Sequence, residues 1–188
     1  MARPRSEDKR NAILAATTDL VAEQGLGAAT AEIAKRAGVP HGSVFTYFGT
    51  KSELLNAVYL ELKTELINTV SAAMPAGDDT RLQLHHLWVS WTHWGASNPS
   101  KRRVLAQLSV SDQITELSRK AAYEGAGSSL ALMRRASANG ALRDAPLQYV
   151  GALVETSVAT TTDFMIRDPA QADAFCKFGF EAVWRALS

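Results

Sequence analysis

The chain has 188 residues, of which 46% are hydrophobic and 21% are charged, and its formal net charge is +1. This composition excludes an intrinsically disordered chain, and the length suits one domain or a small domain followed by a larger one. The balanced charge excludes a protein that is basic throughout, although a local basic edge would still suffice to contact phosphates. Such an edge is present at the N-terminus, which carries Arg3, Arg5, Lys9 and Arg10.

Simple counts exclude two further classes of protein. The only cysteine is Cys176, so the chain forms no internal disulfide and no thiolate zinc cluster, and we expect this side chain to be a small buried hydrophobe. No segment approaches the ~18 consecutive apolar residues of a membrane span. The basic N-terminus also lacks the apolar region of a signal peptide. We therefore predict a cytoplasmic protein that does not bind a membrane.

The chain begins with a predicted helix over residues 6–24, whose apolar stripe ends at Gly25. Two short helices follow it. The first starts at Thr30, whose hydroxyl we expect to cap the helix by accepting a free backbone N–H, and it ends at Gly38. The second covers residues 41–48. Two short helices joined by a tight turn are typical of a helix-turn-helix.

The helix at residues 41–48 has two unlike faces. Val44 and Phe48 are four residues apart, and we expect both to face the core. The other side carries hydrogen-bonding side chains in place of solubilising charges: His41, Ser43, Thr46 and Tyr47. A short helix with such a face is a candidate reader of base edges in DNA.

The rest of the chain is also helical in pattern, because few segments alternate with a period of two residues. Breaks rich in Pro, Gly and Asn divide it into six further helices, and residues 125–127 form a soft spot within one of them. The prediction is an all-α fold of about nine helices. The six further ranges are 51–74, 79–96, 100–110, 114–137, 146–167 and 168–187, the last with Asp168 as its cap and Pro169 in its first turn.

Three motifs in the first third of the chain carry a family resemblance. Residues 33–39 read IAKRAGV, residues 42–48 read GSVFTYF and residues 51–55 read KSELL. Over residues 6–60 the pattern resembles the DNA-binding domain of TetR-type transcriptional regulators. Phe45 departs from the pattern, because the family often has tyrosine there, and a hydroxyl available to DNA is therefore missing.

The resemblance implies a helix-turn-helix DNA-binding domain at residues 1–50 and a helical ligand-binding and dimerisation domain at 51–188. It implies a homodimeric regulator, most simply a repressor, that binds palindromic double-stranded operator DNA and is released by a small ligand, which we expect to be mainly apolar from the tryptophan-rich helix described below. The alternative is a DNA-binding dimer of the same fold without a ligand. Matching positions assign base contacts to His41, Ser43 and Thr46, close approach to Gly42, a thymine-methyl contact to Phe45, and phosphate contacts to Thr30, Tyr47 and Lys51.

The predicted helix at residues 79–96 is unusual because it carries three tryptophans at spacings of three. These rings either pack in the core or line a ligand cavity, and the sequence leaves both readings open. The absence of concentrated charge around them predicts a neutral or weakly polar ligand. The tryptophans are Trp88, Trp91 and Trp94, and the selected ligand contacts are Trp88, Trp91, Thr92 and Gln107.

The last two predicted helices are strongly apolar. Their faces either pack only within the protomer or form a two-fold dimer interface, as the resemblance implies. The interface candidates are Leu147, Val150, Val154, Val158, Thr161, Phe178 and Ala182.

No pattern of catalytic residues stands out. His86 and His93 could share a helix face, but they are seven residues apart and no carboxylate lies between Arg81 and Ala96 to complete a zinc site. The chain also lacks a phosphate-binding loop, a nucleophile elbow and a dinucleotide fingerprint. We therefore predict neither an enzyme nor a bound metal or cofactor. The remaining alternative is a helical enzyme or lipid carrier with an incidental helix-turn-helix.

Overall fold

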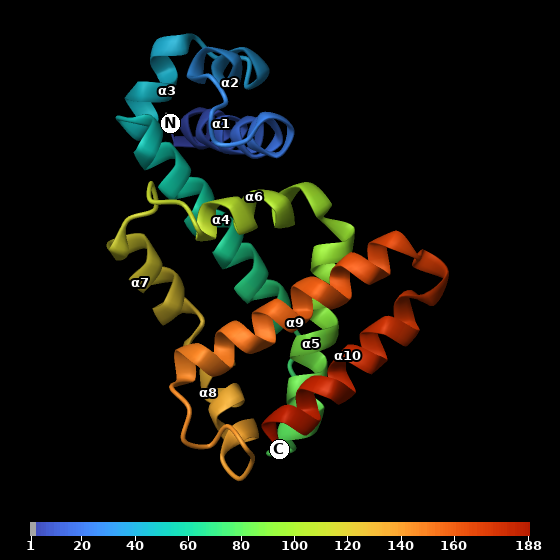
Figure 1. Ribbon diagram of the computed structural model, residues 1–188. Coiled ribbons are helices and arrows are strands. Elements are labelled where there is room, and N and C mark those ends of the chain that lie inside the picture. Colours follow the sequence, from blue (N-terminus) through green and yellow to red (C-terminus); the bar gives the residue numbers. More distant parts are fainter. Residues whose placement is uncertain (1–2) are drawn as a thin grey trace. The chain divides into compact units, whose positions relative to one another are not determined.

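The computed structural model describes residues 3–188, with side chains from residue 6 onward, and within this range the fold is all-α (Figure 1). This confirms the predicted fold class. The elements are α1 (Arg3–Gln24), α2 (Thr30–Arg36), α3 (His41–Phe48), α4 (Lys51–Ser71), α5 (Thr80–Ser97), α6 (Pro99–Ser109), α7 (Glu116–Gly125), α8 (Gly127–Ser137), α9 (Leu147–Arg167), the 3-10 turn η1 (Pro169–Gln171) and α10 (Ala172–Leu187).

The helices form two compact units. The first comprises Met1–Thr64 and Pro99–Ala122, and the second comprises Glu65–Asn98 and Tyr123–Ser188. Helix α6 therefore packs in the same unit as α1, α2 and α3, although it lies in the middle of the chain, and α4 and α7 each contribute residues to both units. This division concerns packing, so the functional boundary predicted at residue 50 stays a prediction.

In the first unit, α1, α2 and α3 bury a small apolar core. The predicted stripe of α1 is buried, and α2 adds Ile33 and Ala34. Gly25 and Gly38 follow α1 and α2 with φ of 79° and 67°, a left-handed backbone that glycine adopts most easily. Helix α6 packs against α1, where Arg103 donates to the Ala22 carbonyl at 3.3 Å. The core thus holds the turn between α2 and α3 in place.

The start of α4 is set by two residues that follow α3. Gly49 has φ of 64°, and the carboxylate of Glu53 occupies the space where a side chain at this glycine would lie. The Thr50 hydroxyl accepts the backbone N–H of Glu53 at 3.1 Å and caps α4. Lys51 is therefore the first residue of the helix, as the sequence predicted.

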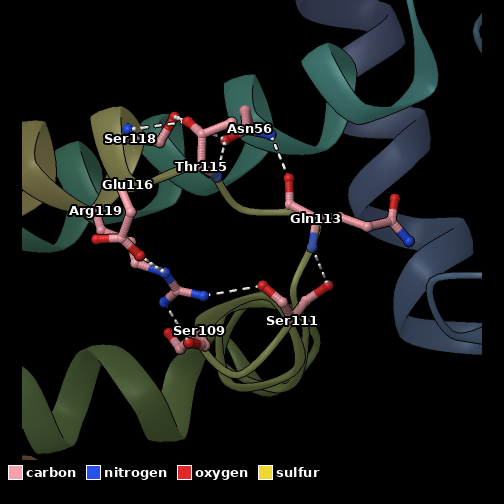
Figure 2. Close-up of polar contacts among 8 residues, drawn as sticks. All are labelled: Asn56, Ser109, Ser111, Gln113, Thr115, Glu116, Ser118 and Arg119. Carbon is pink, nitrogen blue, oxygen red and sulfur yellow. Dashed lines mark hydrogen bonds and ion pairs between the residues drawn. The ribbon is translucent and has the colours of Figure 1, made fainter.

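A polar cluster joins α4 to the segment between α6 and α7 (Figure 2). The Asn56 amide nitrogen donates to the Gln113 carbonyl at 2.8 Å, and its oxygen accepts the backbone N–H of Thr115 at 3.0 Å. The same nitrogen also donates to the Ser52 carbonyl at 2.8 Å. The Thr115 hydroxyl in turn accepts the backbone N–H of Ser118 at 3.2 Å and caps α7. One nearly buried amide therefore fixes both a helix and the segment beside it.

Arg119 closes the other side of this cluster (Figure 2). Its guanidinium donates to the carbonyls of Ser109 and Ser111 at 2.7 and 2.9 Å and forms an ion pair with Glu116 at 3.6 Å. A cation on the last carbonyls of a helix interacts favourably with the helix dipole, so Arg119 stabilises the C-terminus of α6.

The second unit packs α9 against α5, α8 and α10 (Figure 1). Trp88 of α5 is fully buried, and its indole N–H donates to the carbonyl of Cys176 at 2.9 Å. Gly179 of α10 lies so close to Thr161 and to the Trp88 ring that no side chain would fit there. Cys176 is buried as predicted. No helix in residues 3–188 is long and apolar enough to cross a lipid bilayer.

Three predicted helices have different ends in the structure. The single helix predicted over 114–137 is two helices, because the chain breaks at Ala126 between two glycines. The helix predicted to 74 ends at Ser71, two residues before Ala73, which has a left-handed φ of 52°. The last predicted helix begins with the 3-10 turn η1, and the Asp168 side chain accepts from the Gln171 amide at 2.9 Å instead of capping an α-helix.

We predict that Asn56→Leu lowers the free energy of unfolding by about 1–3 kcal/mol, because it leaves the Thr115 N–H without its partner and removes one of the two donors to the Gln113 carbonyl. Asn68→Leu, an exposed position on the same helix, should stay within about 0.5 kcal/mol of the parent. Urea unfolding measured by circular dichroism compares the two variants. Equal effects at both positions would contradict a specific role for the polar cluster.

Candidate nucleic-acid interface

Helix α3 turns its predicted inner face to the core and its other face outward. Val44 and Phe48 are buried, which confirms the prediction for this face. The Phe45 ring is 41% exposed. His41, Gly42 and Thr46 are also exposed, whereas Ser43 and Tyr47 are half-buried. The exposed side of α3 therefore carries one aromatic ring, small residues and uncharged polar groups.

Two polar groups of this face already have partners within the protein. The His41 ring nitrogen Nε2 lies 3.1 Å from the Thr30 hydroxyl, and Thr46 donates its hydroxyl to the Gly42 carbonyl at 3.0 Å. The His41 ring also meets Phe45 edge to face, with 5.4 Å between ring centroids. The prediction that Thr30 caps α2 is wrong. Ala29 is the N-cap residue and forms no side-chain hydrogen bond, whereas Thr30 is the first residue of the helix and its hydroxyl contacts His41.

Lys51 and Gly42 have the properties that close contact with DNA requires. Lys51 lies in the first turn of α4, where a cation interacts unfavourably with the helix dipole, and its ammonium group has no ion pair or hydrogen bond among the described residues. Gly42 has open space where a side chain would begin, so packing within the protein does not require glycine there. Both features favour an external partner for this face.

Unlike Lys51, the basic side chains of Arg36 and Arg10 have partners within the protein. Arg36 forms a two-point ion pair with Glu23 at 2.6 and 2.9 Å, and this contact lowers the pKa of the Glu23 carboxyl and raises the pKa of Arg36. Because the carboxyl pKa is lower in the folded state, the pair adds stability at neutral pH, which is lost as acid protonates Glu23. The guanidinium of Arg10 lies over the Phe48 ring at 5.4 Å. The side chains of Arg3 and Arg5 lie outside the described residues.

The residues selected as ligand contacts do not form one group. Trp88 and Trp94 are buried, and their indole N–H groups donate to the Cys176 carbonyl and to the Glu65 carboxylate. Trp91 is half-buried, and its N–H has no partner among the described residues. Thr92 is fully buried and donates its hydroxyl to the Trp88 carbonyl at 3.0 Å. Gln107 lies on α6 in the first unit, beside Gly25.

Most of the residues selected for a dimer interface lie in the core of their own protomer. Val150, Val154, Val158 and Thr161 are at most 8% exposed, because α9 turns them toward α5, α8 and α10. Leu147 is half-buried, and Phe178 and Ala182 are exposed. The outward stripe of α9, which is not among the predicted interface residues, runs through Tyr149, Ala152, Thr156, Thr160 and Phe164. Its spacing of three or four residues was the available signal.

The family described as "Bacterial regulatory proteins, tetR family" matches residues 13–58, which span α1 to the first part of α4. The HTH-type transcriptional regulator BetI of Escherichia coli is 30% identical over 174 residues, covering 75% of this chain and 88% of its own length. The chain belongs to the TetR family. Its matched region spans only 38% of another relative, the HTH-type transcriptional repressor Rv3405c of Mycobacterium tuberculosis, at 45% identity over 71 residues.

Solved structures support the TetR-family assignment over nearly the whole fold. A protein of Shewanella sp. PV-4, assigned to the TetR family of transcription regulators, is 26% identical, with a TM-score of 0.86 and coverage of 95% of this chain and 97% of its own. A TetR family transcription regulator from Marinobacter aquaeolei VT8 has a TM-score of 0.82 at 23% identity, with 98% of each chain covered, and shares the fold. The second unit is therefore part of the shared fold.

Proposed function

We propose that this TetR-family protein is a transcriptional regulator, most simply a repressor, that binds palindromic operator DNA in the cytoplasm as a homodimer. The observation that carries the proposal is the outward face of α3, which has exposed uncharged groups on one side and the buried Val44 and Phe48 on the other. A helix anchored in this way can lie in a major groove. The repressor name of the mycobacterial relative supports the sign of the regulation.

The proposed DNA contacts are of two kinds, contacts to base edges and contacts to phosphates. Ser43, with His41 and Thr46, lies on α3 where base edges would be read, and Gly42 lets the helix backbone approach closely. Lys51 and the Tyr47 hydroxyl would hold phosphates on either side, with Thr30 nearby through its contact with His41. In this proposal residues 1–50 read DNA, and residues 51–188 serve dimerisation and ligand binding.

The direct test is selection from a library of randomised DNA duplexes. If the protein enriches no sequence, the proposed function is wrong.

With the selected duplex, we predict that Lys51→Ala and Tyr47→Phe weaken binding to all sequences alike. Lys51→Ala should also reduce the slope of log affinity against log salt by about one per half-site. Ser43→Ala should instead change which bases are preferred. An unchanged salt slope for Lys51→Ala, measured by fluorescence anisotropy, would remove Lys51 from the phosphate contacts.

The proposed dimer uses the outer faces of α9 and α10. Phe164 of α9 lies 5.3 Å from Phe175 of α10, between ring centroids, and Phe178 is 67% exposed on the outside of α10. Small exposed residues lie elsewhere on the two helices, including Ala152 of α9 and Ala182 of α10. Exposed rings together with small exposed residues allow two copies of the same face to approach closely, which suits an isologous two-fold interface.

We predict that Phe178→Arg gives a folded monomer with weak operator binding, because the dimer would bury an unpaired charge. Leu82→Arg, at an exposed position on α5, is the matched control and should leave the dimer intact. Light scattering at micromolar concentration measures the mass. Val154→Arg should unfold the protomer instead, since this position is 1% exposed in the single chain. A monomeric parent protein would contradict the proposed interface.

The proposed effector is a small, mainly apolar molecule bound beside α5 in the second unit. Trp91 supports it, because a half-buried indole whose N–H lacks a partner can offer both a ring and a hydrogen bond to a ligand. The alternative remains a regulator of the same fold without an effector. Two open grooves in this unit are further positions for a ligand: one of about 530 Å³ with Leu130, Ala131 and Arg134 in its lining, and one of about 330 Å³ between α5 and α10.

We predict that a neutral apolar compound that releases the selected duplex also quenches tryptophan fluorescence over the same concentration range. Trp91→Phe should remove most of the quenching and raise the concentration needed for release. Trp184→Phe, on α10, is the matched control and should respond like the parent. A panel in which no compound releases DNA would favour the alternative without an effector, and a normal response of Trp91→Phe would exclude Trp91 as the contact.

A further inference from the structure

We infer that the groove along α8 is a second ligand site, and that it binds an amphipathic carboxylate, an organic molecule with a carboxylate at one end and an apolar body. The whole lining of the groove lies in the second unit, on the end of α7, on α8 and at the start of α9. Its volume of about 530 Å³ is within the ~300–1,000 Å³ of small-molecule sites. The site is separate from that of the proposed neutral effector beside Trp91, and it does not depend on DNA binding.

The groove follows one face of α8. Gly127, Ala131 and Arg134 line it at intervals of four and three residues, so they lie on the same side of the helix. Gly127 is the first residue of α8 and Arg134 is in its last turn, so roughly 10 Å of helix lies between them. A ligand that lies along the groove therefore has a cation at one end only.

The rest of the groove offers apolar surface. The Tyr123 ring is 42% exposed, and Leu130 and Leu147 are half-buried. Leu130 lies beside Gly151 of α9, where a side chain would contact it. Ala131 is exposed and too small to fill the space above these residues. Covering partly exposed rings and leucines with an apolar molecule is favourable, because it removes their surface from water.

Arg135 is held at the cationic end by a neutral partner. Its guanidinium donates to Oε1 of Gln83 at 2.5 Å, and the Gln83 amide nitrogen donates to the carbonyls of Pro75 and Gly77 at 3.0 and 2.8 Å. An amide fixes the position of a guanidinium without neutralising its charge. Arg135 forms no other hydrogen bond and no ion pair within the part of the chain that the structure describes, so its remaining N–H donors are available to a ligand.

Arg134 places a second positive charge at the same end. Its guanidinium has neither a hydrogen bond nor an ion pair with any residue described. The last turn of α8 favours both cations through the helix dipole, but the dipole amounts to only about half a charge. Glu124, the carboxylate in the lining, already interacts with another group of the protein. Two arginines without a carboxylate partner match a ligand carboxylate, which a guanidinium binds through two parallel hydrogen bonds.

The test compares octanoate with octanamide, which has the same chain but no charge, by isothermal titration calorimetry. The parent protein should bind octanoate about tenfold more tightly than octanamide, because hydrogen bonds to a charged group are the stronger ones. Arg134→Gln should lose most of this preference. Arg185→Gln is the matched control, because Arg185 is also exposed and in the last turn of its helix but lies outside the groove, and it should keep the preference. Circular dichroism confirms that each variant is folded.

A second arm locates the bound molecule. Ala131→Phe fills the groove and should prevent binding of both compounds, whereas Ala186→Phe, at an exposed alanine of α10 outside the groove, should bind like the parent. Trp91→Phe should also bind octanoate like the parent. The inference is overturned if octanoate shows no saturable binding at millimolar concentrations or if Arg134→Gln keeps the preference. It is also overturned if Trp91→Phe removes binding and Ala131→Phe does not, because octanoate would then occupy the proposed effector site. Selection of a DNA duplex is a separate measurement, so the proposed function stands or falls independently.

Discussion

The burial of Val44 and Phe48 on the side of α3 that packs against α2 is the constraint on which the outward face of α3 depends. These two side chains set the rotation of α3 about its axis, and that rotation decides that Phe45 and Thr46 point outward. The left-handed glycines at 25 and 38 bring α2 and α3 into place without a long connection. A substitution that overfills this core or leaves a cavity in it would therefore shift the exposed residues of α3 without replacing any of them.

The first unit is completed by residues from the middle of the chain. The amide of Asn56 and the guanidinium of Arg119 together hold α4, the end of α6 and the start of α7 through backbone carbonyls and one backbone N–H. Carbonyl partners of this kind leave no signature in a sequence, because every residue has one. The cluster is nearly buried at Asn56, where hydrogen bonds count for more because an unpaired group is costly.

Prediction from the sequence was most accurate for features that depend both on the spacing of apolar side chains and on the local backbone preferences of the same residues. The bounds of α3, the buried pair Val44 and Phe48, and the glycine after α2 follow from spacing and turn chemistry within a few residues. It was least accurate at the ends of helices whose capping depends on distant groups. Thr30 is an example, because its hydroxyl meets His41 from another helix. Whether the selected residues contact DNA, a ligand or a second protomer stays a prediction.

The sequence by itself determined the all-α class, the helix-turn-helix and the family, because these depend on short-range spacing. Only the tertiary structure decided which of two apolar stripes on α9 faces inward. Val154 and Val158 are as apolar as an interface would require, but packing against α5, α8 and α10 buries them within the protomer and leaves Tyr149 and Phe164 outside. Both stripes satisfy the same helical period, so periodicity could not rank them. The choice depends on which neighbours reach each stripe, and those neighbours are distant in sequence.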